Sequence, residues 1–431
     1  MQKSTENMIV KILKSEMVKA LGCTEPIAIA YAAATARKYL GDLPENIVVC
    51  CSGNIIKNAK AVTVPMTDNL RGIEAAAVVG TVGGDPDKKL EVLTTVTKED
   101  LVVCKDMLAR KICRVEMLDT PENLHIIVKM SDSSHKVEVE LVRTHTGITK
   151  ITRDGEVIYS HECQETSDGN DYSCLNIDTI YEFAATVDLK ILKDTIHDQI
   201  ECNEKIAEEG LRHDYGSQVG KTLLEMYGDQ DIKIVAKAKP AAGSDARMNG
   251  CEMPVVINSG SGNQGMTVSL PVIEYAKKLN SSEEKLYRAL VLSNLISIYL
   301  KCRIGRLSAY CGAVSAAAGA GAGITFLMDG SKKQIQDTIT NTLGNISGIV
   351  CDGASSSCAA KIASSVDAAI NSAYMAMNGK VFMDGEGIVK DNLQHTVDGV
   401  VEIAKDGMKT TDQVILNVMI HDDTAPCSNE K

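Results

Sequence analysis

The sequence predicts an α+β fold, in which an α/β module is inserted into a largely helical protein. Between residues 44 and 165, short runs rich in Val and Ile alternate with helical segments. After residue 175, nearly every segment carries apolar residues at helical spacing. The polar, turn-rich stretch 161–174 between these regions indicates a linker. We therefore expect N-terminal helices in 1–43 that pack on the helical domain, the α/β module in 44–165, and the helical domain in 175–431.

The N-terminal part is expected to contain two helices. Charged and apolar residues alternate at helical spacing over residues 6–21, and Gly22 ends this pattern. A second helix is expected from Thr24, as its N-cap, to about Tyr39. Cys23 then lies next to a helix N-terminus, whose partial positive charge stabilises a thiolate. We expect Cys23 to be exposed and reactive; the alternative is a thiol that only fills space.

Five segments of the α/β module have strand character, with Val and Ile in partial alternation. They are residues 46–53, 89–96, 111–118, 124–130 and 135–142. Residues 71–80 and 98–110 between them have helical patterns. Asn54 and Lys57, in a Gly-containing corner after the first strand, are polar side chains that we expect to reach a bound ligand. The alternative for Lys57 is a solvated surface lysine.

The helical domain is predicted from a series of amphipathic segments. They are residues 177–187, 190–210, 216–227, 267–279, 282–302, 331–347, 356–377 and 393–406. The uncharged run Tyr310–Met328 has the length of a membrane span, but its many Gly and Ala residues predict a tightly packed interior helix instead. The tail 421–431 is expected to be loose.

Composition excludes some classes of protein. The net charge is −12, from 45 basic and 57 acidic residues, and the basic residues form no stripe. With no Trp and only three Phe to stack on bases, a nucleic-acid-binding role is not expected. The N-terminal segment lacks the continuous apolar run of a signal peptide, so we expect a cytoplasmic protein without a membrane anchor. In that reducing compartment the 14 cysteines favour metal or catalytic roles over disulfides.

Three cysteines of the helical domain form the main candidate metal site. Cys351 and Cys358 flank Asp352-Gly353, and Gly353 permits a turn that would bring them close before the next helix begins. Cys311 occupies a similar position, in the expected first turn of a helix capped by Ser308. Three such thiolates suit zinc or an iron–sulfur cluster, and with only three ligands one iron would remain open as a Lewis acid. The alternative is three unconnected core cysteines.

The loop "NSGSGNQG" at 258–265 is the main candidate anion site. It lies between a short apolar run and a helix, so the backbone N–H groups at the helix start would bind a carboxylate or phosphate. No Gly-Lys-Ser/Thr follows, which excludes a Walker motif. A plain turn is the alternative. The residues expected to bind the substrate here are Ser259, Gly260, Ser261, Asn263 and Gln264, together with Thr24.

Taken in order, these motifs resemble the L-cysteine desulfidase family, which is related to the α chain of the iron–sulfur L-serine dehydratases. The resemblance rests on 22–26 (GCTEP), 52–58 (SGNIIKN), 72–85 (GIEAAAVVGTVGGD), 258–265, and the cysteines at 311, 351 and 358. It implies an oxygen-sensitive [4Fe-4S] cluster bound by these three cysteines, with Cys23 as the base that removes the α-proton. It also implies cleavage of L-cysteine to hydrogen sulfide, ammonia and pyruvate. The serine dehydratases end on a cysteine; here the nearest cysteine to the final Lys431 is Cys427.

Other functions remain open at this point. L-Serine would lose its hydroxyl by the same route, so L-serine dehydratase is the first alternative. The 259–265 loop also resembles the carboxylate loop of pyridoxal phosphate-dependent lyases, although Lys239 lacks the usual setting of a Schiff-base lysine. A non-catalytic iron–sulfur sensor is the third alternative. The expected ligand is a small amino acid, and the sequence leaves open whether the chain forms a homodimer.

Overall fold

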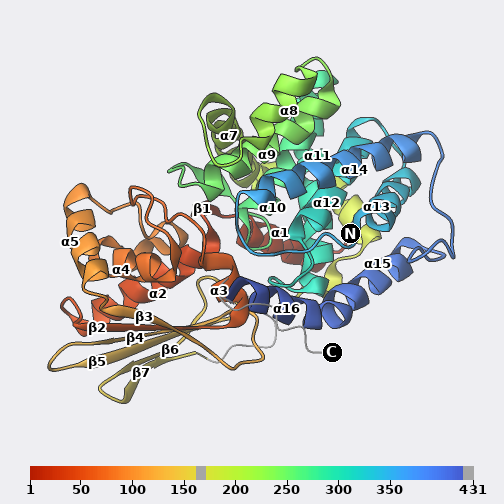
Figure 1. Cartoon of the computed structure of the whole chain (residues 1–431). Coiled ribbons are helices and arrows are strands. Elements are labelled where there is room, and N and C mark those ends of the chain that lie inside the picture. Colours follow the sequence, from red (N-terminus) through yellow and green to blue (C-terminus); the bar gives the residue numbers. More distant parts are fainter. Residues whose placement is uncertain (162–170, 421–431) are drawn as a thin grey trace, which may run out of the picture.

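The computed structural model describes residues 1–161 and 171–420 (Figure 1). It confirms the α+β fold, with a mixed sheet and its helices beside a larger body of helices. The strands are β1 (Lys19–Leu21), β2 (Asn46–Cys51), β3 (Cys113–Met117), β4 (His125–Ser131), β5 (Lys136–Val142), β6 (Ile148–Arg153), β7 (Glu156–Ser160) and β8 (Pro254–Val256). The helices of the first part are α1 (Lys3–Glu16), α2 (Thr24–Leu40), α3 (Gly53–Ala59), α4 (Gly72–Gly83) and α5 (Lys98–Ala109).

The larger body contains α6 to α16. These are α6 (Ile177–Thr186), α7 (Lys193–Arg212), α8 (Val219–Tyr227), α9 (Ile232–Met248), α10 (Gly262–Lys278), α11 (Glu283–Ile304), α12 (Gly312–Leu327), α13 (Lys332–Ile346), α14 (Ser357–Met377), α15 (Leu393–Glu402) and α16 (Lys409–Ile420). Short helical turns are η1 (Pro86–Glu91), η2 (Tyr172–Cys174), η3 (Leu189–Ile191) and η4 (Ile403–Gly407).

The main sheet has the strand order β3-β2-β4-β5-β6-β7. Only the β2–β3 pair is parallel; the other neighbours are antiparallel. Alternate residues of β4 and β5 are buried, which is the pattern of a sheet with one covered face. Helix α2 packs on these two strands and on α4, while α1 contacts α11 of the larger body. The domain boundaries stay a prediction.

The structure departs from the sequence-based predictions of secondary structure in several places, and strands β6, β7 and β8 and helices α3 and α16 were not predicted. Residues 89–96 form part of η1 and a turn instead of a strand, with Asp85 capping η1 and Pro86 in its first turn. The first helix ends at Glu16 because residues 19–21 pair with β8. Helix α9 was not predicted at all. Most of the predicted linker 161–174, namely residues 162–170, lies outside the described residues. The predicted tail 421–431, with Cys427, also lies outside them.

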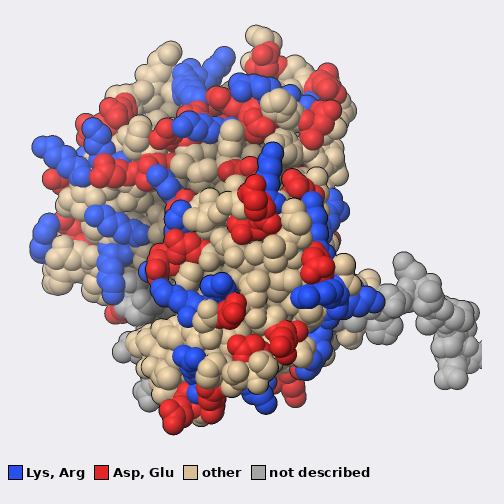
Figure 2. All heavy atoms as spheres, turned by 90° about the vertical axis from the view of Figure 1, so that its left-hand side faces the viewer, with Lys and Arg blue, Asp and Glu red and all other residues tan. Residues whose placement is uncertain are grey.

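Helix α12 lies at the centre of the larger body, surrounded by α10, α11, α13 and α14 (Figure 1). Its small residues allow this close packing, as expected for 310–328. A Cβ atom on Gly319 would lie 2.4 Å from the carbonyl oxygen of Ser293 in α11. Within the described chain, no helix combines the length and apolar character needed to cross a membrane. On the face shown in Figure 2, basic and acidic side chains are interspersed.

Gly319→Ala should lower the free energy of unfolding by about 1–3 kcal/mol, because the added methyl group forces α11 and α12 apart. Thermal and denaturant unfolding would measure this. Gly407→Ala is the matched control, since no atom lies within 4 Å of the position of its Cβ. Equal unfolding midpoints for both variants would contradict the proposed packing constraint.

Candidate active site

One cavity collects most of the predicted site residues. Its lining comes from Asn58 of α3 and from five segments that are distant from one another in sequence. These segments are residues 23–25, 247–248, 261–264, 301–313 and 351–362. Cys23, Cys311, Cys351 and Cys358 all line this cavity. The structure therefore brings together the expected base, the expected anion loop and the three expected metal ligands. We call this space the cysteine cavity.

Local backbone structure holds the three ligand candidates at the cavity. Cys311 is itself the N-cap of α12, so the prediction of Ser308 as the cap is wrong. The Cys311 amide donates to the carbonyl of Ile349 at 3.0 Å, and the Cys351 amide donates to the carbonyl of Ala309 at 2.7 Å. These reciprocal bonds fix the segments of Cys311 and Cys351 side by side.

The turn predicted between Cys351 and Cys358 is also present. Gly353 has φ of 97°, a left-handed conformation that favours glycine, and its Cβ would lie 2.3 Å from the carbonyl oxygen of Lys57. Cys358 follows in the first turn of α14. The turn is therefore pressed against α3, and no side chain fits at its apex.

The three thiols interact electrostatically. Burial raises the pKa of Cys311, and the neighbouring Cys351 and Cys358 raise it further. Burial also raises the pKa of Cys358, with a contribution from Cys351. Burial is the largest influence on the pKa of Cys311 and of Cys358, although both lie at the start of a helix. A bound metal centre would supply the positive charge that such thiolates require.

Within residues 1–161 and 171–420, no three His, Cys, Asp or Glu side chains are close enough to bind a single metal ion. A cluster makes a different demand, because each cysteine binds its own iron and the sulfurs surround the cluster. Three thiols lining one cavity and sensing one another's charge fit that demand. The residues present are therefore compatible with a cluster bound by three cysteines.

Cys23 is in a different state from the one expected. It is the N-cap of α2, a position predicted for Thr24, and it is buried rather than exposed. Its Sγ donates to Oε2 of Glu25 at 3.0 Å. Burial and the negative charge of Glu25 raise the pKa of Cys23 well above its usual range, while Arg247 opposes this. The thiol form of Cys23 is therefore favoured.

Glu25 is the ionised partner of Cys23. Burial alone would raise its pKa, but His145 and the thiol of Cys23 outweigh burial and lower it to about 2. Nε2 of His145 lies 3.7 Å from Oε1 of Glu25. Because His145 follows β5, the α/β module contributes directly to the charge at this site.

A hydrogen bond joins the Cys23 segment to the predicted anion loop. Oγ1 of the buried Thr24 donates to the carbonyl oxygen of Gly260 at 2.9 Å. Ser261 is the N-cap of α10, and its side chain accepts from the amide of Gln264. Side chains of Ser261, Asn263 and Gln264 line the cysteine cavity. Ser259 instead lines a neighbouring cavity.

Asn54 and Lys57 do not line the cysteine cavity. Nδ2 of Asn54 donates to Oδ1 of Asn123 at 3.4 Å, and the buried Lys57 forms an ion pair with Asp412 of α16. Both line a separate cavity beneath α16.

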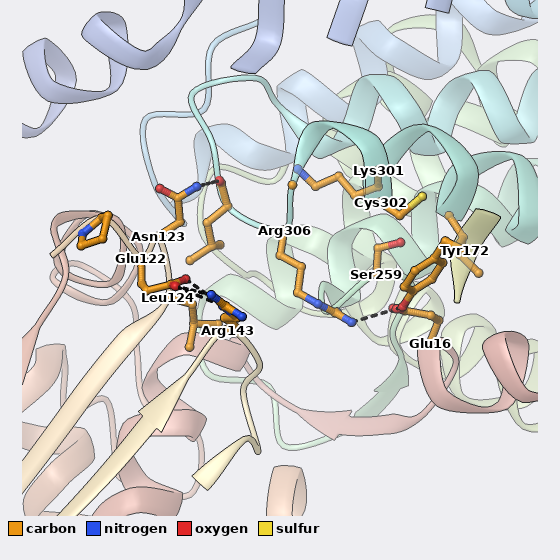
Figure 3. A pocket seen from close by; sticks show the side chains of 14 residues that line it. Glu16, Glu122, Asn123, Leu124, Arg143, Tyr172, Ser259, Lys301, Cys302 and Arg306 are labelled. Carbon is orange, nitrogen blue, oxygen red and sulfur yellow. Dashed lines mark hydrogen bonds and ion pairs between the residues drawn. The ribbon is translucent and has the colours of Figure 1, made fainter. Parts of the chain in front are cut away.

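The neighbouring cavity has a volume of about 380 Å³ and lies between the α/β module and the helical body (Figure 3). Arg306 pairs there with Glu16, and Arg143 pairs with Glu122. Lys301, Arg306 and Leu307 line both this cavity and the cysteine cavity. The two spaces therefore adjoin one another.

Sequence reasoning missed the charged residues of the site. Lys301 and Arg247 are buried, at 3% and 2% exposure, and both line the cysteine cavity. Burial lowers the pKa of Lys301 to about 8, against the opposing effect of Cys351 and Cys311. Arg247 belongs to α9, a helix whose pattern is obscured by internal Pro240. Burial of Glu25 and His145 had no local signal.

Comparison with known proteins shows the family of this chain. The family model described as serine dehydratase alpha chain matches residues 87–417. A UPF0597 protein of Lachnoclostridium phytofermentans is 61% identical over 414 residues, covering 96% of this chain and 99% of its own. UPF0597 proteins of Treponema denticola and Finegoldia magna are 46% and 48% identical, covering 98% and 95% of this chain and 100% and 98% of their own. The chain therefore belongs to the serine dehydratase alpha chain family.

Proposed function

We propose that the protein is an iron–sulfur-dependent L-cysteine desulfidase, a carbon–sulfur lyase that converts L-cysteine to hydrogen sulfide, ammonia and pyruvate. The observation that supports this best is the cysteine cavity, in which Cys311, Cys351 and Cys358 meet Cys23 and the loop before α10. Family membership supports the elimination of a β-substituent from a small amino acid. L-Serine is the alternative substrate by the same mechanism.

Each part of the cavity has a role in this reaction. When bound to Cys311, Cys351 and Cys358, a [4Fe-4S] cluster would supply a Lewis acid for the leaving group. The N-terminus of α10, with Ser261, would bind the substrate carboxylate. This position places the carboxylate in the same cavity as Cys23.

Cys23 is proposed to remove the α-proton as a thiolate. It must first lose its own proton, and of the groups around it Arg247 favours the thiolate whereas the Glu25 carboxylate opposes it. Loss of the α-proton and of sulfide leaves 2-aminoacrylate. This enamine tautomerises and takes up water, releasing ammonia and pyruvate.

The α/β module is proposed to shape this site, because His145 reaches Glu25 from the loop after β5. A pyridoxal phosphate-dependent mechanism gains no support, since Lys239 pairs with Glu274 at 2.7 Å and does not line the cysteine cavity. An iron–sulfur sensor would not need the combination of Cys23 and an anion site in one cavity.

Protein purified without oxygen should contain iron and sulfide and should form pyruvate from L-cysteine. Pyruvate and sulfide assays with L-cysteine and with L-serine would test this and rank the two substrates. Full iron content without pyruvate from either amino acid would favour the sensor instead.

Cys351→Ala should lose at least half of the bound iron, because two thiolates remain for a cluster that needs three. Iron analysis of protein purified without oxygen measures this. Cys113→Ala, in the edge strand β3, is the matched control and should keep its iron. Unchanged iron in Cys351→Ala would exclude Cys351 as a ligand.

Cys23→Ala should lower kcat by about 100-fold or more, the usual contribution of a general base. Its iron content should equal that of the wild type, because the predicted role of Cys23 is in proton transfer. Parallel iron and pyruvate assays separate the two roles. Loss of iron in Cys23→Ala would instead make Cys23 a ligand.

A further inference from the structure

Arg247 has an unusual environment for a buried arginine. It lies in the last turn of α9, is 2% exposed, and lines the cysteine cavity. One guanidinium nitrogen donates to Oδ1 of Asn263 at 3.1 Å, while its buried Nε has no hydrogen-bond partner. Among the described residues, no carboxylate lies within ion-pair distance of it. The carboxylate that interacts with Arg247 electrostatically, Glu25, lies beyond that distance, so an anion bound nearer would compensate this buried charge more fully.

The start of α10 is built to accommodate this guanidinium. A Cβ atom on Gly262 would lie 2.4 Å from Nε of Arg247, so any larger residue would displace the side chain. Gly262 is the first residue of α10, immediately after its N-cap Ser261. The guanidinium therefore lies against the N-terminus of α10 at the cavity, and both groups favour an anion.

A second buried cation lies elsewhere around the cavity. Lys301 senses the charges of Cys311 and Cys351, whereas Arg247 senses those of Cys23 and Glu25. Lys301 is thus placed to compensate the negative charge of the proposed ligands Cys311 and Cys351. Arg247, on the side of the proposed base, is left for a different anion.

We propose that Arg247 binds the α-carboxylate of the substrate and restricts the site to α-amino acids with a free carboxylate. This inference rests on the proposed function and names the group that makes the anion site specific. A guanidinium matches the planar geometry of a carboxylate, and one that is buried and preorganised binds it strongly. Oε1 of Gln264 is buried without a donor in the same cavity, which suits the substrate ammonium group.

The test uses binding, so that it does not depend on turnover. L-Alanine has the carboxylate and ammonium groups but no leaving group, and L-alaninamide lacks the negative charge. Calorimetry with the iron-loaded protein under anaerobic conditions should show that the wild type binds L-alanine at least tenfold more tightly than L-alaninamide. Arg247→Met should abolish this preference, and Arg247→Lys should retain part of it because it keeps the charge but loses the planar fork.

Arg110→Met is the matched control, because Arg110 lies on the surface and its ion-pair partner among the described residues is Asp106. It should leave the preference for L-alanine unchanged. Melting curves and iron content would show whether the variants at position 247 fold; if Arg247→Met does not, Arg247→Lys must still weaken L-alanine binding by about tenfold. Binding of L-alanine within twofold of the wild type in a folded position-247 variant, or no preference in the wild type, would overturn the proposal.

Failure of this inference differs from failure of the proposed function. If the wild type forms pyruvate while Arg247→Lys and Arg247→Met keep wild-type KM and L-alanine affinity, the desulfidase proposal stands without Arg247. If the protein forms no pyruvate but the preference for L-alanine over L-alaninamide disappears in Arg247→Met, Arg247 binds the carboxylate of an amino acid in a protein of another function.

Discussion

The site depends on one contact between two segments that are distant in sequence, the hydrogen bond from Oγ1 of Thr24 to the carbonyl oxygen of Gly260. It joins segments 236 residues apart and leaves the N-terminus of α2 facing that of α10. The short β1–β8 pair reinforces the same contact, because its strands end just before these helices begin. Two helix starts thus meet at one cavity, which brings a thiol and the proposed anion site together although neither segment contains both.

Charge balance is the second constraint on the cavity. Arg247, Lys301 and Arg306 line a space that also holds four thiols and the ionised Glu25, and of these three cations Arg306 is paired with Glu16. Burial holds the thiols of Cys23, Cys311 and Cys358 in their neutral form. The cavity therefore suits the two proposed kinds of anion, namely thiolates that bind a metal centre and the carboxylate of an amino acid. The preference for both kinds of anion follows from burial, since water and salt would screen the charges of exposed groups.

The sequence predicted features that depend on local pattern. The interior packing of α12 followed from its Gly and Ala content, and the turn at Gly353 followed from a single residue. Features made by distant neighbours were beyond it. Cys23 is covered by Val62 and Met248, so its burial and raised pKa depend on segments that no local pattern connects. Arg247 was missed because Pro240 obscured the helical pattern of α9, so its guanidinium was not considered as part of the site.

The central claim is that the cysteine cavity holds a cluster with one iron free of protein thiolates. Anomalous diffraction at the iron edge, from crystals grown without oxygen, tests this most directly. The account predicts four iron positions between the sulfurs of Cys311, Cys351 and Cys358, with the fourth iron facing the Cys23 side of the cavity. Absence of iron from this cavity, or a protein cysteine on every iron, would contradict it.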